Sequence, residues 1–222
     1  MRPPSFQSSH LICDLGLWIL RQAALQTKTW LDAGDTARQI AVNVSAAQIW
    51  HTDFAHEVAE VLKETGLSPH LLCLELTESL LADHAEGRVR SVLTALKSLG
   101  VTLALDDFGT GYLSLGYLTQ LPFDTIKIDR IFVDGIANSE SVRKLLEGII
   151  ALGRGLGMTI VAEGAETAEE VAILGEFRCD LVQGYIFARP AAAKDALNSA
   201  WTPEGKGLRA DGSPTATSAA AA

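Results

Sequence analysis

The hydrophobic and polar positions of the chain follow two alternating patterns. Short apolar runs, which are typical of strands buried on both faces, alternate with longer segments whose apolar residues recur every three or four positions, as in helices. The apolar runs cover residues 39–45, 71–77, 101–105, 124–129, 159–163 and 179–183. The helical segments cover residues 11–32, 52–66, 89–99, 112–120, 139–156 and 167–177. This alternation of strands and helices predicts an α/β protein with a parallel sheet.

Each apolar run ends in polar residues. They are Asn43, Glu75, Asp106, Asp107, Lys127, Asp129, Glu163 and Gln183. Polar residues at the carboxyl ends of many parallel strands are typical of the active site of a (β/α) barrel. An open doubly wound sheet is the alternative, but its ligand crevice usually draws only on the strands near one switch point. The chain is therefore predicted to be a TIM-like (β/α) barrel.

The predicted barrel is incomplete, because a closed barrel of this type has eight strands. We expect six βα units to be present and the first two strands to be missing, ahead of residue 1. Residues 1–10 are predicted to be an irregular N-terminal segment, and residues 11–200 the folded domain. From residue 201 the composition turns to Gly, Ser, Thr, Pro and Ala, which predicts a disordered tail over residues 201–222.

The run from Val101 to Gly111 ends in two adjacent carboxylates and a glycine-rich turn. Asp106 and Asp107 repel each other, and the apolar strand places their backbone deep in the fold, so a cationic group is expected beside them. Gly109 and Gly111 are predicted to shape the tight turn. A simpler interpretation is that one aspartate caps the next helix while the other is solvated.

Composition limits the partners of the protein. With 222 residues, of which 48% are hydrophobic and 20% charged, the chain suits one globular domain. A net charge of −9 disfavours a nucleic-acid polymer or an anionic membrane surface as partner, although a small anionic ligand held through metal ions is compatible with it. No membrane span or signal peptide is visible, so a cytoplasmic protein is expected.

Cysteine and histidine do not point to a metal site. Cys13, Cys73 and Cys179 lie far apart without a CxxC pair, which favours reduced structural thiols over disulfides or zinc ligands. The five histidines lack the spacing of three or four residues that places two imidazoles on one helix face. The polar strand ends, in contrast, offer an oxygen-only set of ligands.

Oxygen ligands suit hard divalent cations such as Mg²⁺, Mn²⁺ or Ca²⁺. The five carboxylates at the strand ends carry more charge than one ion needs, and two ions about 4 Å apart would balance them, as in phosphoester hydrolysis. Lys127 then fits as a fixed cation near the attacked phosphorus or the nucleophilic water. Simpler interpretations are that Asn43 caps a loop, that Lys127 pairs only with Asp129, and that Gln183 is a loop residue. A Schiff-base role for Lys127 is a further alternative, which the surrounding carboxylates oppose.

Six stretches together resemble a known family. They are NVSAAQ at 43–48, ELTES at 75–79, DDFGTGY at 106–112, LPFDTIKID at 121–129, VAEGAET at 161–167 and QGYIFARP at 183–190. In this order they resemble the EAL domains, bacterial phosphodiesterases that open cyclic di-GMP to linear pGpG with Mg²⁺ or Mn²⁺ in a modified TIM barrel. The resemblance implies the same fold, the same substrate and a site for two metal ions.

The resemblance also implies roles for individual residues. The implied metal ligands are Asn43, Glu75, Asp106, Asp107, Asp129 and Glu163. The implied catalytic residues are Lys127, which orients the attacking water, Glu163 and Asp107, and the implied substrate-binding residues are Glu166 and Gln183. Glu78 is similar to the glutamate that braces the loop from Asp107 to Tyr112, which in the family touches a dimer partner, so a homodimer is expected. In this loop Leu113 replaces the usual serine.

One family feature is absent. The Glu-Ala-Leu tripeptide, whose glutamate is a metal ligand in the family, occurs nowhere in this sequence. Loss of one ligand is expected to weaken metal binding, so the chain by itself is expected to be poorly active or inactive. The alternative function is a non-catalytic module that binds cyclic di-GMP or dimerises, but such a module has little use for five clustered carboxylates.

Overall fold

The computed structural model describes residues 6–35, 39–81, 86–111, 114–199 and 219–220. The chain divides into two compact units. The first comprises residues 1–104, 112–122 and 218–221, and the second comprises residues 105–111, 123–217 and 222. Strand β3 (Thr102–Phe108) has residues in both units.

The first unit contains strands β1 (Ile40–Asn43) and β2 (Leu72–Thr77), which pair in parallel. Their register places Asn43 opposite Glu75, so two polar strand ends are neighbours in the sheet. The strand order in this unit is β3-β2-β1-β7, where the short β7 (Ala219–Ala220) pairs in parallel with β1. The other residues of the predicted disordered tail lie outside the described part of the chain.

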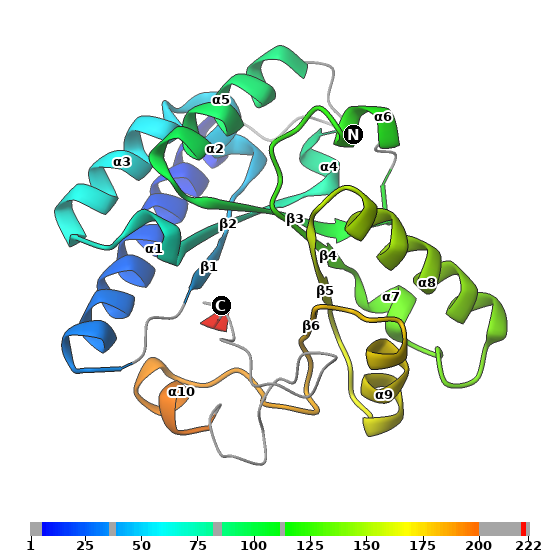
Figure 1. Ribbon diagram of the computed structural model, residues 1–222. Coiled ribbons are helices and arrows are strands. Elements are labelled where there is room, and N and C mark those ends of the chain that lie inside the picture. The colour runs from blue at the N-terminus through cyan, green and yellow to red at the C-terminus, as the bar shows by residue number, and fades with distance from the viewer. Residues whose placement is uncertain (1–5, 36–38, 82–85, 112–113, 200–218, 221–222) are drawn as a thin grey trace. The chain divides into compact units, whose positions relative to one another are not determined.

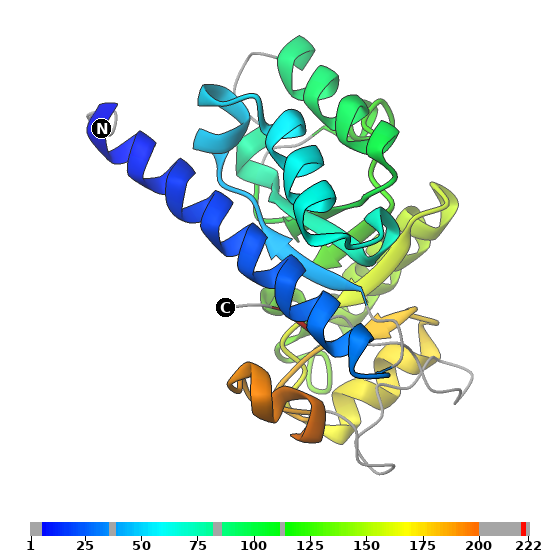
Figure 2. The ribbon, with the colours of Figure 1, turned by 90° about the vertical axis from the view of Figure 1, so that its left-hand side faces the viewer.

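Helices of the first unit pack beside its strands (Figure 1). They are α1 (Phe6–Asp32), α2 (Ala46–His51), α3 (Phe54–Thr65), η1 (Pro69–Leu71), α4 (Glu78–Leu81), α5 (Glu86–Leu99) and α6 (Leu115–Leu118). Figure 2 shows the long α1 running beside α3 and β1, with which it is in contact. The prediction of an irregular segment up to residue 10 is wrong from Phe6 onward, because α1 already begins there.

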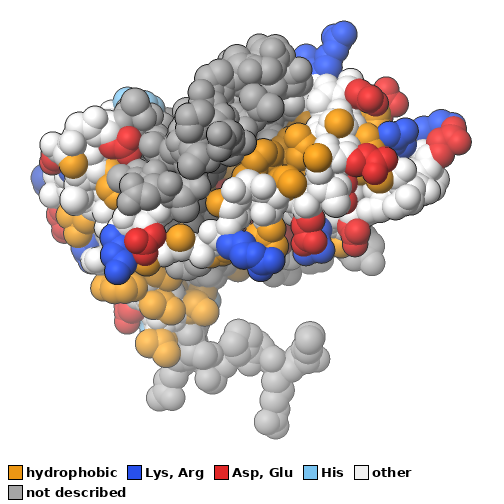
Figure 3. Space-filling model, turned by 90° about the horizontal axis from the view of Figure 1, so that it is seen from below, with side chains coloured by type: hydrophobic (Ala, Val, Ile, Leu, Met, Phe, Trp, Pro, Cys, Tyr) orange, Lys and Arg blue, Asp and Glu red, His pale blue; other side chains and the backbone are white. Residues whose placement is uncertain are grey.

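The two faces of α1 differ in burial. Cys13, Leu20 and Ala24 are buried against the rest of the unit, whereas Leu15 and Trp18 are exposed, the latter at 57%. Figure 3 shows hydrophobic side chains at the surface of one face of the molecule, between acidic and basic ones. Among the described residues, none of the helices combines the length and the hydropathy that crossing a membrane requires.

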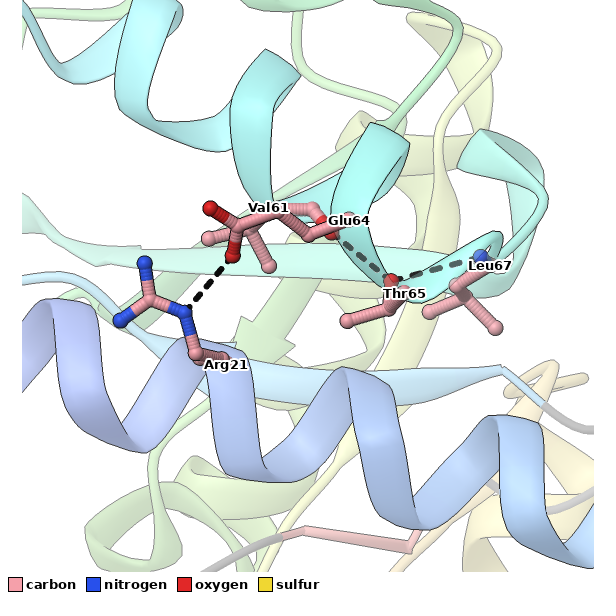
Figure 4. Close-up of polar contacts among 5 residues, drawn as sticks. All are labelled: Arg21, Val61, Glu64, Thr65 and Leu67. Carbon is pink, nitrogen blue, oxygen red and sulfur yellow. Dashed lines mark hydrogen bonds and ion pairs between the residues drawn. The ribbon is translucent and has the colours of Figure 1, made fainter.

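The end of α3 is fixed by polar contacts (Figure 4). The Thr65 hydroxyl donates to the Val61 carbonyl at 2.8 Å and accepts from the backbone N–H of Leu67 at 3.3 Å, and Gly66 ends the helix at φ 66°. The Arg21 Nε atom on α1 donates to Glu64 Oε2 at 2.9 Å. Both of these side chains are partly exposed, so the ion pair contributes at most about 1 kcal/mol.

The helix predicted over residues 52–66 is capped at Asp53 and not at its first predicted residue, Thr52. Ser45 and Gln48 instead form a capping box that starts α2, and Thr52 ends that helix. Asp53 caps α3, since its side chain accepts from the backbone N–H of His56. The extra turn of helix thus moves the cap by one residue.

The second unit has the strand order β3-β4-β5-β6. Its strands β4 (Thr125–Ile128), β5 (Thr159–Ala162) and β6 (Leu181–Val182) pair in parallel. Its helices are α7 (Arg130–Val133), α8 (Glu140–Gly155), α9 (Ala168–Glu176) and α10 (Ala193–Ser199). Thr167, the first residue of the predicted helix 167–177, caps α9 in a capping box with Glu170. All six predicted strands are present, which confirms the α/β class.

The three cysteines are buried thiols that take part in no disulfide among the described residues. Cys179 lies in the second unit, where its thiol donates to the Leu181 carbonyl at 3.2 Å. Burial is the main cause that raises the pKa of the Cys179 thiol to about 12. Because the thiolate is the reactive form, we expect iodoacetamide to leave Cys179 unmodified in the folded protein at pH 8 and to alkylate it after unfolding. Peptide mapping by mass spectrometry checks this, and rapid alkylation of the native protein would contradict it.

Candidate active site

Three strand ends of the second unit meet at Lys127. The side chain of this residue is buried on β4, and its Nζ atom lies 3.2 Å from Asp106 Oδ1 and 2.7 Å from Glu163 Oε1. Asp106 belongs to β3 and Glu163 follows β5, which are the two neighbours of β4 in the sheet. The cation expected beside the paired aspartates is therefore Lys127. The alternative that Lys127 pairs only with Asp129 is wrong.

The turn after Asp106 has an unusual backbone. Asp107 adopts a left-handed conformation with φ 54°, which short polar residues tolerate better than most. Its N–H donates to Asp106 Oδ1 at 3.1 Å, and its carbonyl accepts from the Thr110 hydroxyl at 2.8 Å. Gly109 has φ 96°, and a Cβ atom there would lie 2.6 Å from the ring of Phe132. The predicted role of Gly109 in a tight turn is thus confirmed.

Asp107 lies next to a second carboxyl group, that of Asp129. Burial raises the pKa of Asp107, and the negative charges of Asp106 and Asp129 and a side-chain hydrogen bond with Asp129 raise it further, while Lys127 opposes them. Asp129 is held in place as the cap of α7, because its Oδ1 accepts from the backbone N–H of Ile131 at 2.8 Å. A carboxylate whose negative charge is disfavoured in this way fits a place where a cation can bind.

The donor set suits a hard cation, because Asp107 and Asp129 offer only oxygen atoms. Among the described residues, no group of three Asp, Glu, His or Cys side chains is arranged to hold an ion in this conformation. The Lys127 ammonium group lies against both Asp106 and Glu163. The carboxylate oxygens of Asp107 and Asp129 are compatible in charge and chemistry with a hard divalent cation.

The predicted ligands Asn43 and Glu75 belong to the first unit. They lie opposite each other on β1 and β2, and Glu75 is buried. Glu78, also buried, begins α4. Tyr112 and Leu113, at the far end of the loop that Glu78 is predicted to brace, lie outside the described residues, so this role stays a prediction.

The predicted substrate-binding residues lie on two connected loops of the second unit. The N–H of Gln183 donates to the Ala162 carbonyl at 2.8 Å, and the N–H of Ala165 donates to the Gln183 carbonyl at 3.1 Å. The segment after β6 is thus tied to the loop that carries Glu163. Glu166, on the same loop, accepts from Arg130 Nη1 at 2.9 Å.

Arg130 is a residue that the sequence analysis missed. Its aliphatic chain lies against Gly164, where a Cβ atom would come within 2.5 Å of Arg130 Cγ. The sequence contained a signal for its place in the site. Arg130 directly follows Asp129, so it lies at the same edge of the sheet as the other charged residues. The pair with Glu166 contacts the loop after β5 from the β4 side, and because both side chains are about half exposed it contributes at most about 1 kcal/mol.

A family model described as the EAL domain matches residues 3–190. The chain belongs to the EAL domain family. The match covers both described units and agrees with the resemblance of the six sequence stretches.

Relatives of this EAL domain include the bifunctional diguanylate cyclase/cyclic di-GMP phosphodiesterase MucR of Pseudomonas aeruginosa, which is 39% identical over 196 residues. The alignment covers 88% of the chain but only 28% of MucR, so the EAL domain spans about a quarter of the length of this relative.

Solved structures of similar domains include "PaMucR Phosphodiesterase, c-di-GMP complex", with a TM-score of 0.80 and 38% identity over 86% of this chain and 77% of that one. A manganese/cy-diGMP complex of Klebsiella pneumoniae BlrP1 has a TM-score of 0.74 and 31% identity over 82% of this chain and 45% of that one. These similarities confirm the predicted TIM-like (β/α) fold.

Proposed function

We propose that this EAL domain hydrolyses cyclic di-GMP to linear pGpG with the help of Mg²⁺ or Mn²⁺. The observation that carries the proposal is the buried Lys127 ammonium group between Asp106 and Glu163, next to the carboxyl pair of Asp107 and Asp129. The kinship with MucR, which is named for this activity, supports the substrate, and the manganese complex of BlrP1 supports the metal.

In the proposed reaction, water attacks phosphorus in line and the ribose 3′ oxygen leaves. Lys127 is held rigidly by two carboxylates, so its positive charge is fixed where negative charge develops on the phosphate, and no reorganisation is needed during the reaction. Glu163 and Asp107 position the attacking water through their oxygen atoms. A metal ion held by Asp107 and Asp129, with Asn43, Glu75, Asp106 and Glu163 as further candidate ligands, would supply Lewis-acid activation of that water.

Gln183 and Glu166 are proposed to contact the substrate from the two connected loops after β6 and β5. The homodimer, through the loop from Asp107 to Tyr112, and the cytoplasmic location remain predictions. The regulatory alternative is a domain that binds cyclic di-GMP without cleaving it.

The test is to incubate the purified chain with cyclic di-GMP and Mn²⁺ and to measure pGpG by chromatography. We expect slow formation of pGpG that stops on addition of EDTA and resumes when excess Mn²⁺ is added. Tight binding of cyclic di-GMP in calorimetry without any product would support the regulatory alternative. Absence of both binding and product would contradict the proposed substrate.

A further inference from the structure

The short helix α7 contacts two turns of the candidate site at once. It follows β4, whose neighbours in the sheet are β3 and β5. The Phe132 ring packs on the turn at the end of β3, because a Cβ atom on Gly109 would lie 2.6 Å from Phe132 Cε2. The Arg130 side chain packs on the turn after β5, because a Cβ atom on Gly164 would lie 2.5 Å from Arg130 Cγ. Each of these side chains thus occupies the space that a side chain on the glycine would need.

The two contacts lie on opposite sides of α7. Successive residues of an α-helix are rotated by about 100°, so the side chains of Arg130 and Phe132, two positions apart, point in nearly opposite directions. Between them, Ile131 is 61% exposed, whereas the next residue, Val133, is fully buried. The helix is therefore anchored on the core through Val133 and reaches one turn on each side.

Hydrogen bonds at both ends hold α7 together. At its start, the Asp129 carboxylate accepts from the N–H of Ile131 at 2.8 Å, and the Asp129 carbonyl accepts from the N–H of Phe132 at 3.1 Å. At its end, the Arg130 carbonyl accepts from the N–H of Asp134 at 2.8 Å. A single helical turn that is bonded at both ends moves as a unit, so a displacement of one of its side chains also displaces the other.

We propose that α7 is a positioning element that couples the two turns. Its Phe132 side chain acts on the backbone two residues after Asp107, and its Arg130 side chain acts on the backbone next to Glu163. Both carboxylates are proposed to position the attacking water, so the catalytic part of this inference rests on the proposed function. The coupling itself belongs to the fold and is measurable without substrate.

Hydrogen exchange of the whole chain in EDTA, followed by mass spectrometry, tests the coupling. Phe132→Ala is expected to raise the exchange rate about tenfold in the turn that it contacts, residues 107–111, and also in the turn after β5, residues 163–167. Arg130→Ala is expected to act on both turns in the same way. Arg130→Met keeps the aliphatic stem on Gly164 and is expected to resemble the unaltered chain. Ile131→Ala is the matched control, because Ile131 belongs to the same helix and faces solvent.

Kinetics with cyclic di-GMP and Mn²⁺ give the second readout. In Phe132→Ala and Arg130→Ala, kcat is expected to fall about 10- to 100-fold while KM changes by less than about threefold, because misplaced carboxylates impair the reaction more than they impair binding. Phe132→Leu keeps part of the packing volume and replaces Phe132→Ala in both assays if thermal unfolding shows that the alanine variant does not fold. Exchange of α3, which belongs to the first unit, is the internal reference for global destabilisation.

The outcomes separate the coupling from the proposed function. If each substitution raises exchange only in the turn that its own side chain contacts, the two contacts are independent and the inference is wrong. Equal effects of Ile131→Ala and Phe132→Ala would overturn it as well, because weakening of the helix alone would explain them. If exchange is coupled but kcat is unchanged, the positioning role is wrong. If the unaltered chain forms no pGpG while exchange in both turns responds to each substitution, the proposed function fails and the coupling stands.

Discussion

Replacement of Lys127 by methionine is expected to lower the rate of cyclic di-GMP hydrolysis on the order of 10²- to 10³-fold. The methionine side chain fills most of the same volume but removes the charge that lies 3.2 Å from Asp106 and 2.7 Å from Glu163. The same change leaves two largely buried carboxylates without their cation, so the free energy of unfolding should fall by about 3 kcal/mol. Chromatography of pGpG and urea unfolding, each with Mn²⁺ and with EDTA, measure both effects.

Lys144 is a matched control that separates the effect of burying an ion pair from the effect of the distance between its charged atoms. Lys144 Nζ also lies 2.7 Å from a carboxylate oxygen, that of Glu140, but the Lys144 side chain is 73% exposed, compared with 8% for Lys127. Lys144→Met is expected to change the free energy of unfolding by at most about 0.5 kcal/mol, because exposed pairs one helical turn apart contribute little. Equal effects of the two substitutions on the free energy of unfolding would show that the contacts of Lys127 with Asp106 and Glu163 stabilise the protein no more than an exposed ion pair does.

Added Mn²⁺ should restore part of the stability of Lys127→Met, because a cation can then neutralise the carboxylates that the lysine no longer pairs with. The unaltered chain should gain less from the same addition. An identical gain in both proteins would mean that the ion and Lys127 act on different carboxylates.

Much of the second unit was predictable from the sequence because its signals are local. An apolar run followed by a polar residue predicts a strand end, and this signal correctly located β3, β4 and β5 together with Asp106, Lys127 and Glu163. Parallel strands that are adjacent in the sheet bring their carboxyl ends together, so the meeting of these three side chains followed from the order of the elements. Repulsion between Asp106 and Asp107 also correctly predicted a nearby cation.

Other features depend on tertiary contacts that a sequence pattern does not contain. The pattern of α1 shows which residues lie on one side of a helix, but not that Leu15 and Trp18 are exposed while Leu20 is buried. The short helix α7 was missed, because four residues give no periodicity, although Asp129 is a typical N-cap. The ion pair between Arg130 and Glu166 joins the start of α7 to the loop after β5, which are far apart in the sequence, so no local signal specified this pair.

Replacement of Gly184 by alanine is expected to destabilise the protein by about 3 kcal/mol or more and to lower hydrolysis as well. The added methyl group would lie 1.9 Å from the Ala165 carbonyl oxygen and 2.5 Å from the Ala165 nitrogen, and both of these are backbone atoms that no rotamer change can move. The loop after β5 would have to shift, which would break the hydrogen bond that the Ala165 carbonyl accepts from Ile186. Glu163, two residues before Ala165, would move away from Lys127.

Gly148 provides the matched control for this last substitution. It lies inside α8, and a Cβ atom there would meet no other atom within 4 Å. Gly148→Ala is therefore expected to raise the free energy of unfolding by about 0.5–1 kcal/mol, because alanine restricts the unfolded chain and favours the helix. Chemical unfolding of both variants measures the change in the free energy of unfolding, which should be negative for Gly184→Ala and positive for Gly148→Ala. Should Gly184→Ala prove as stable and as active as the unaltered chain, the backbone contact between the loops after β5 and β6 would not be the one that positions Glu163.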